Sequence, residues 1–214
     1  MKTTVSIAAL TMSSAMLLAG CAGKPQPPDW QPNAKGSLDA YTAAWLDGDT
    51  AAAETEFARA RRATASTGRF DNVAQAELAR CAARVAALDY DCPGYVALAG
   101  DATPAQQAYA AYLQGQWQGL NASLLPEQHR AVVTSGSLAG VQDPLARLVA
   151  AGALMKAGRI APADIANAVD TASNQGWRRP LLAWLGVQAQ RARAAGDAQA
   201  VERIARRMAL ASEN

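Results

Sequence analysis

Residues 43–60 read AAWLDGDTAAAETEFARA, and this stretch decides the fold class. A run of helix-forming residues stops at Gly48, and glycine readily adopts the left-handed backbone that ends many helices. Asp49 follows, and an aspartate in this place is typical of an N-cap that accepts amide hydrogens from the next helix. The stretch therefore predicts two helices, over 37–47 and 50–64, that reverse direction at a tight turn.

The same punctuation recurs along the chain. Thr103-Pro104-Ala105-Gln106 combines an N-cap, a proline at the first helical position and the glutamine of a capping box. Alanine makes up about a quarter of the sequence and no segment alternates as a strand does, so we expect an all-α fold. Short loops favour stacked antiparallel helical hairpins. The remaining helices are expected near 72–88, 104–117, 126–134, 144–157, 162–175, 180–195 and 198–211, with Asp71, Asp143 and Asp197 as further N-caps and Gly158 and Gly196 at further reversals.

The stretch around Gly48 resembles the turn and second helix of a tetratricopeptide repeat (TPR). The resemblance implies that Gly48 forms the turn, that Ala53 allows close helix approach and that Phe57 fills the groove between hairpins. Repeats of that family recur about every 34 residues, whereas the corresponding glycines here, at 48, 115, 158 and 196, are irregularly spaced. Two interpretations stay open: a degenerate TPR-like or irregular α-solenoid, and an irregular helical bundle.

Residues 1–20 have the layout of a signal peptide. Lys2 precedes an apolar run of roughly 14 residues, shorter than the ~20 that a membrane span needs. The run ends in Leu18-Ala19-Gly20-Cys21, which resembles the lipobox of bacterial lipoproteins. The resemblance implies that Cys21 receives a diacylglycerol and further acyl chains such as palmitate. Because Ala22 rather than aspartate follows, it also implies anchoring in the outer membrane, with the domain facing the periplasm; the alternative is an ordinary signal peptide with a chance cysteine.

The segment after the lipobox is rich in proline. Residues 21–36 contain four prolines, so we expect an extended tether there and a single helical domain over 37–214. Trp30, within the tether, is expected to pack rather than to bind a ligand. The tryptophans of the domain are expected to be core anchors rather than ligand-stacking groups: Trp45, Trp117, Trp177 and Trp184.

Few residues suit catalysis. The single histidine, His129, excludes most metal sites and most base-dependent chemistry, and we expect it to be solvated on its helix. A catalytic site made only of carboxylates would use residues such as Asp89, Asp91 or Asp101. The alternative is that these aspartates cap helices and keep the surface soluble. No metal, cofactor or catalytic residue is therefore predicted.

Cys81 and Cys92 face an oxidising compartment and are expected to form a structural disulfide, the alternative being free or reactive thiols.

Charge is unevenly distributed along a nearly balanced chain. The near balance argues against nucleic acid as a partner. Residues 29–101 carry a formal charge of −4 and residues 178–214 one of +4, with arginine as the only basic residue of the latter segment. These arginines either pair with the acidic half or form a docking surface for an acidic partner or anionic lipid headgroups. The docking surface would consist of Arg191, Arg193, Arg203, Arg206 and Arg207, backed by an apolar stripe of Val201, Ile204, Ala205 and Met208.

These features together predict a non-catalytic, lipid-anchored periplasmic adaptor or scaffold that binds another cell-envelope protein. The alternative is a small envelope hydrolase or ligand-binding lipoprotein with a site that the sequence does not reveal. An open, grooved stack of helices would favour the adaptor, whereas a pocket with paired carboxylates would favour the second class.

Overall fold

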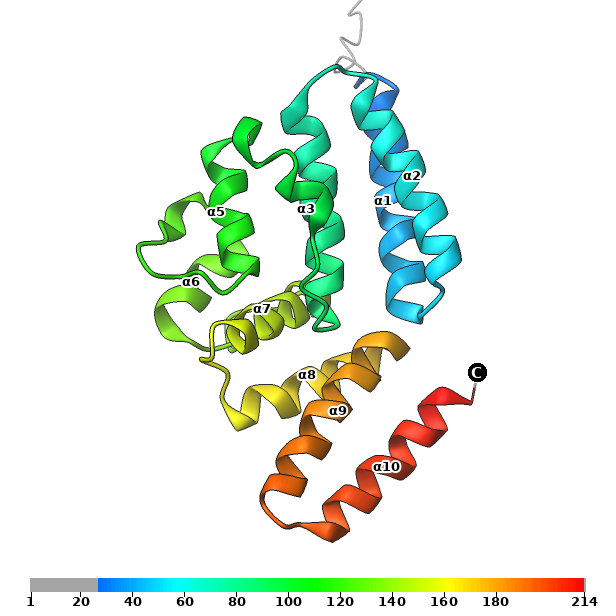
Figure 1. Ribbon diagram of the computed structural model, residues 1–214, viewed down its shortest axis with the longest axis vertical. Helices are drawn as coiled ribbons and strands as arrows, with labels where there is room; N and C mark the ends of the chain where they lie inside the picture. Colours follow the sequence, from blue (N-terminus) through cyan, green and yellow to red (C-terminus); the bar gives the residue numbers. More distant parts are fainter. Residues whose placement is uncertain (1–26, 214) are drawn as a thin grey trace, which may run out of the picture.

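The computed structural model describes residues 27–213, and in this part of the chain the regular elements are all helices, joined by loops and without a strand (Figure 1). The expected all-α fold is confirmed. Cys21 and residues 1–20 lie outside the described residues. The α-helices are α1 (Trp30–Asp47), α2 (Thr50–Ala65), α3 (Phe70–Ala86), α4 (Pro93–Val96), α5 (Pro104–Leu113), α6 (Glu127–Ser135), α7 (Pro144–Lys156), α8 (Pro162–Gln175), α9 (Arg178–Ala194) and α10 (Ala198–Ser212), with 3₁₀ turns η1 (Ala99–Asp101) and η2 (Ala122–Leu124).

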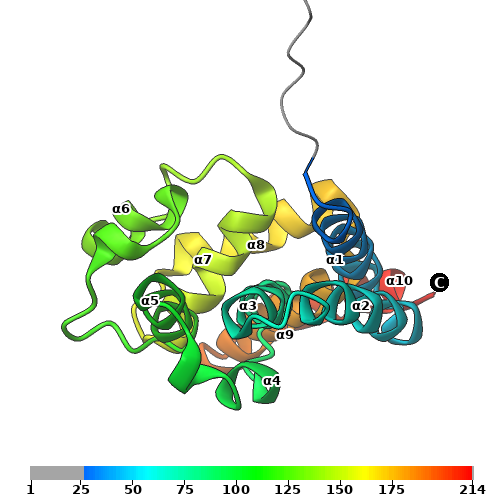
Figure 2. The same ribbon diagram turned by 90° about the horizontal axis from the view of Figure 1, so that it is seen from above.

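The helices pack as a bundle of hairpins. Helices α1 and α2 form the first hairpin, and α3 packs against both of them. Helix α3 also contacts α5 and α7, and the chain then continues through α8 and α9 to the last hairpin, α9–α10 (Figures 1 and 2). Helix α9 returns to contact α1, so the first and last hairpins meet.

The first hairpin forms as the sequence predicts. Gly48 adopts a left-handed backbone with φ of 94°, and the Asp49 side chain accepts the amide hydrogen of Ala52. Ala53 is fully buried, which allows α1 and α2 to approach closely. Phe57 lies against Tyr41 of α1 and beneath the Arg80 guanidinium of α3, so it fills the space between the hairpin and α3.

Most of the predicted helix starts are confirmed. Thr103 and Gln106 form a full capping box, and Asp143 and Asp197 each accept an amide hydrogen from the first turn of their helix. Asp71 is an exception, because α3 already begins at Phe70 and places this aspartate within its first turn. The Arg69 guanidinium there donates a hydrogen bond to Asp71 and holds the pKa of that carboxyl below its usual value.

The predicted tether is too long at its C-terminal end. Helix α1 begins at Trp30 rather than near residue 37, and it includes both Pro32 and Gly36. Proline is tolerated there because the first four amide groups of a helix have no intrahelical carbonyl partner. Trp30 is half-buried, in keeping with a packing role.

The core is centred on α3, α7 and α9. Trp184 of α9 is fully buried, and its indole Nε1 donates a hydrogen bond to the Ala86 carbonyl oxygen at 3.0 Å. Trp45 is also buried, whereas Trp117 and Trp177 are half-buried and pack against the edge of the core. Trp45 and Trp184 therefore fit the expected role of core residues best.

The expectation of a solvated His129 is wrong. Its side chain is buried, and its Nδ1 lies 3.2 Å from the Tyr112 hydroxyl oxygen, at hydrogen-bonding distance. The ring also stacks on Tyr109, with the ring centroids 5.8 Å apart. Burial lowers the pKa of His129 to about 4, although nearby Asp143 acts in the opposite direction. The error arises because α6 turns both His129 and Val132, three residues apart, toward the core.

Candidate functional site

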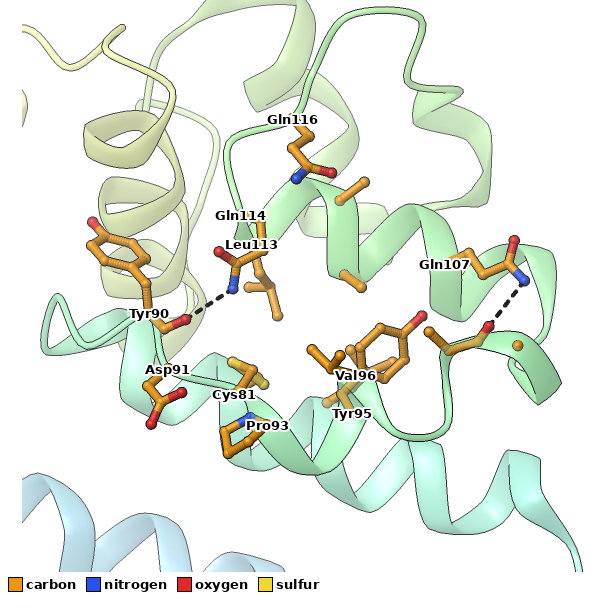
Figure 3. A pocket seen from close by; sticks show the side chains of 16 residues that line it. Cys81, Tyr90, Asp91, Pro93, Tyr95, Val96, Gln107, Leu113, Gln114 and Gln116 are labelled. Atoms are coloured by element: carbon orange, nitrogen blue, oxygen red, sulfur yellow. Dashed lines mark hydrogen bonds between the residues drawn. A yellow bond between two sulfur atoms is a disulfide. The ribbon is translucent and has the colours of Figure 1, made fainter.

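A groove of about 1000 Å³ runs along α5 (Figure 3). One side consists of α5, and the opposite side consists of α4 and the η1 turn that follows it. Leu78 and Leu113 supply apolar surface, and the Cys81–Cys92 disulfide also lines the groove. Leu78 and Leu113 are themselves buried, whereas Val96 of α4 is 71% exposed, so Val96 presents apolar surface to solvent at the groove.

The groove exists because small residues occur where larger ones would fill it. Ala110 and Ala111 face it from α5, and Ala99 and Gly100 line the other side. Gly94 allows α4 to lie close to α3, because a Cβ atom at this position would come within 2.1 Å of the Glu77 carboxylate. The buried carboxylate is paired with Arg61, whose Nε donates to Oε1 at 3.0 Å.

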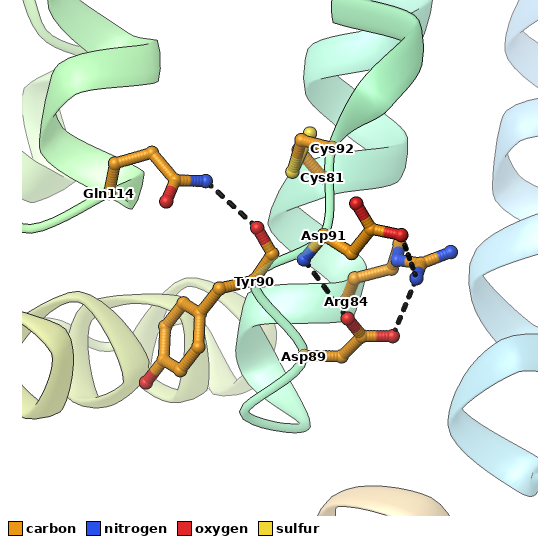
Figure 4. Close-up of a disulfide and its surroundings, with 7 residues drawn as sticks. All are labelled: Cys81, Arg84, Asp89, Tyr90, Asp91, Cys92 and Gln114. Carbon is orange, nitrogen blue, oxygen red and sulfur yellow. Dashed lines mark hydrogen bonds and ion pairs between the residues drawn. A yellow bond between two sulfur atoms is a disulfide. The ribbon is translucent and has the colours of Figure 1, made fainter.

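The predicted disulfide is present and fixes the floor of the groove. Cys81 lies in α3, Cys92 immediately precedes α4, and their Cα atoms are 5.5 Å apart (Figure 4). A bridge that closes so short a loop typically stabilises a fold by about 2–3 kcal/mol. It joins the short helix α4 directly to the long helix α3.

Asp89, beside the disulfide, holds this loop, whereas Asp91 contributes only weakly. The Arg84 Nη2 atom lies 2.7 Å from the Asp89 carboxylate and 3.8 Å from that of Asp91 (Figure 4). Asp89 also accepts the backbone amide hydrogen of Asp91. Asp101 lies separately, on the exposed η1 turn. The structure thus does not bring the three aspartates together as a catalytic cluster.

Gln107 of α5 and Gln114, the C-cap of that helix, donate hydrogen bonds to backbone carbonyl oxygens at the two ends of the groove. At one end, Gln114 Nε2 donates to the Tyr90 carbonyl oxygen at 3.0 Å. At the other end, Gln107 Nε2 donates to the Ala102 carbonyl oxygen at 2.9 Å. Figure 3 shows these two amides on opposite sides of the apolar stretch. The Oε1 atom of each amide makes no hydrogen bond within the described residues, so each keeps a free acceptor.

The groove carries little charge. Among its lining residues Asp91 is the one charged side chain, and no lysine, arginine or histidine lines it. Burial raises the pKa values of Tyr90 and Tyr95 above the ordinary tyrosine value, so both hydroxyls stay protonated at neutral pH. No pair of groups in the groove combines a nucleophile with a base.

The predicted arginine surface lies on the last hairpin, away from the groove. Its five members are exposed, and within the described residues their sole ion pair joins Arg206 to Glu202 at 3.9 Å on the same helix. The structure therefore gives no pairing between these arginines and the acidic N-terminal half. We call this the arginine surface: Arg191 and Arg193 of α9, with Arg203, Arg206 and Arg207 of α10.

Helix α10 packs mainly against α9 and has no fully buried residue. Val201, Ile204 and Met208 are half-buried as expected, but Ala205 is exposed, which corrects the predicted stripe. On the outward side, the α10 arginines and Leu210 surround a shallow hollow of about 320 Å³. Leu210 is 69% exposed there, so apolar surface adjoins the charges.

Two other arginines of α9 act structurally. Arg179 Nη2 donates to the Thr50 hydroxyl oxygen at 2.7 Å, and Arg178 Nε donates to the Asp47 carbonyl oxygen at 3.0 Å. The Arg179 guanidinium also lies 3.9 Å from the Trp45 ring centroid. These contacts fix the start of α9 against the turn between α1 and α2.

Sequence reasoning missed the groove. The available signal was the spacing of Gln107 and Gln114, seven residues apart on one helix face with alanines between them.

The lipidation residue Cys21 lies outside the described residues. No helix in the described part of the chain is long and apolar enough to cross a membrane, and no cluster of His, Cys, Asp or Glu there suits a metal ion. Comparison with family models, curated proteins and solved structures found no match for this chain.

Proposed function

We propose that the protein is a non-catalytic adaptor, anchored by lipid at Cys21 to the periplasmic face of the outer membrane, that binds an acidic surface of another envelope protein. The observation that carries this proposal is the arginine surface, which is exposed and has one ion pair among five cations. Arginine favours such a role because its planar fork forms paired hydrogen bonds with carboxylates. The ion pair of Asp89 with Arg84 at 2.7 Å weighs against the hydrolase alternative.

The position of the hairpin favours a protein partner over lipid headgroups. The chain enters the domain at Trp30, the first residue of α1, whereas α9 contacts the Asp47 end of the same helix. An 18-residue helix is about 27 Å long. The last hairpin therefore lies at the end of α1 remote from the lipid anchor that we propose (Figure 1).

The anchor is tested by Cys21→Ser. We expect complete loss of labelling by radioactive palmitate and accumulation of an unlipidated precursor, with no membrane-associated mature protein, because the acyl chains that contribute about 0.8 kcal/mol per buried CH₂ group are then absent. Ala22→Asp is the matched control: it should keep the label but shift the protein toward the inner membrane. An unlabelled wild-type protein would show that the lipobox interpretation is wrong.

The docking surface is tested by reversing two charges, Arg203→Glu with Arg207→Glu. Exposed charges contribute under about 1 kcal/mol each to folding, so the melting temperature should change little. Binding to the acidic partner, once recovered by crosslinking, should weaken at least tenfold, and its salt dependence should decrease. The matched control, Arg59→Glu with Arg62→Glu on α2, makes the same change of charge elsewhere and should bind normally. Strong destabilisation by the α10 pair, or unchanged binding, would contradict the proposal.

A further inference from the structure

We infer that the groove between α4 and α5 is a second binding site, one that takes an extended, apolar peptide segment of three or four residues beside a lysine or arginine. This inference goes beyond the proposed function, because the groove shares no residue with the arginine surface and lies on other helices. Three properties of the groove support it: its length, its hydrogen-bonding groups and its charge.

The length of the groove fits a short extended segment. Gln107 of α5 and Gln114, the C-cap of that helix, lie at the two ends of the groove, seven residues apart, or about 10 Å along the helix axis. An extended chain advances about 3.3 Å per residue, so three to four residues fit between the two amides. The surface between them is apolar, with Leu113 on one side and the exposed Val96 on the other (Figure 3). Covering Val96 would remove apolar surface from water, which favours binding.

The hydrogen-bonding groups suit a peptide backbone. The Gln114 side-chain nitrogen donates to the Tyr90 carbonyl oxygen across the groove. The Gln107 side-chain nitrogen donates to the Ala102 carbonyl oxygen and, at 3.4 Å, to that of Ala99 on the opposite side. These bonds hold each amide in a fixed orientation. Their Oε1 atoms remain as acceptors, and a peptide supplies an N–H donor at every residue other than proline. An acyl chain has no such donor, so it would leave these acceptors unused.

The charge of the groove selects against anions. No cation lines the groove itself, and two cations beside it are engaged, Lys156 over the Tyr90 ring and Arg84 with Asp89, so a phosphate or carboxylate headgroup is disfavoured there. Asp91 is 72% exposed, and its distance of 3.8 Å from Arg84 exceeds the 2.7 Å of Asp89, so its carboxylate remains able to receive a basic side chain. A lysine or arginine at one end of the apolar segment would complement it.

The test uses the full-length lipidated protein in nanodiscs and two pools of N-acetylated, C-amidated tetrapeptides. Each peptide has three apolar residues and a final lysine in one pool or a final glutamate in the other. Retained peptides are identified by mass spectrometry, and their Kd values are measured by fluorescence anisotropy. We expect retention from the lysine pool, with binding at least tenfold weaker to Ala111→Leu, which fills the groove. Ala58→Leu, the same change at an exposed site on α2, should bind like the wild type.

Further variants separate the contributions. Asp91→Asn should lower the preference for lysine over glutamate at least threefold, and Arg203→Glu with Arg207→Glu should leave peptide binding unchanged. Val96→Ser, at an exposed position, replaces Ala111→Leu as the critical variant if circular dichroism shows that the latter unfolds. The inference is overturned if neither pool is retained, if the critical variant binds like the wild type, if the glutamate pool is preferred, or if a labelled fatty acid binds the groove and the peptides do not.

Discussion

Replacing Gly152 by alanine should lower the free energy of unfolding by about 3 kcal/mol or more, at the upper end of the overpacking range. A Cβ atom at this position in α7 would lie 2.2 Å from the Val85 carbonyl oxygen of α3 and 2.8 Å from Val85 Cγ1. The obstructing atom belongs to the backbone of a central helix, so it cannot move aside as a side chain can. The Tyr90 hydroxyl also donates to the Gly152 carbonyl oxygen at 2.9 Å, and a shift of α7 would disturb that bond.

Gly186→Ala is the matched control for this prediction. Gly186 lies inside α9, and no atom lies within 4 Å of a Cβ added there. Alanine is favoured over glycine in a helix by up to about 1 kcal/mol, so this change should stabilise the protein. Chemical denaturation of both variants measures the contrast. Similar effects of the two substitutions would mean that α3 and α7 do not cross as closely as described.

Acid should destabilise the wild-type protein through His129. The pKa of this residue is about 4 in the folded protein, against 6.5 for an ordinary histidine, so between these pH values the unfolded chain binds the extra proton. Stability from the neutral, buried ring is therefore complete above pH 6.5 and is lost as the pH falls toward 4. At 1.36 kcal/mol per pH unit, about 2 kcal/mol should be lost between pH 6.5 and 5.

The variant His129→Gln isolates this contribution, because glutamine does not titrate and still offers a hydrogen-bonding group to Tyr112. Its unfolding free energy, measured by urea denaturation at pH 7.5, 6.5 and 5, should fall less steeply than that of the wild type. Parallel profiles for the two proteins would contradict a buried, neutral His129.

The parts of the fold that depend on local chemistry could be predicted from the sequence. Gly48 with Asp49, and Thr103 with Gln106, specify their turn and helix start through groups a few residues apart. The start of α1 was missed because proline can either interrupt a chain or occupy the first helical turn, as Pro32 does. The burial of His129 was missed because it depends on tertiary packing against Tyr109 and Tyr112.

The same distinction between local sequence pattern and tertiary packing applies to the candidate sites. The arginine surface could be predicted, because i, i+3 and i+4 spacing places Arg203, Arg206 and Arg207 on one side of a helix wherever that helix packs. The disulfide was predicted from the oxidising compartment that the signal-peptide layout implies and from the short separation of its cysteines. The spacing of Gln107 and Gln114 indicates one face of α5, but the groove itself depends on how α4 packs opposite that face, which no local pattern specifies.

Site-specific photocrosslinking in intact cells tests the adaptor proposal most directly. A benzophenone amino acid replaces Leu210, which is 69% exposed beside the α10 arginines, or Phe70, which is 58% exposed at the start of α3. We expect one discrete adduct with an acidic envelope protein from position 210, lost when Arg203→Glu and Arg207→Glu are added, and no such adduct from position 70. Absence of an adduct at position 210, or its persistence after charge reversal, would contradict the account.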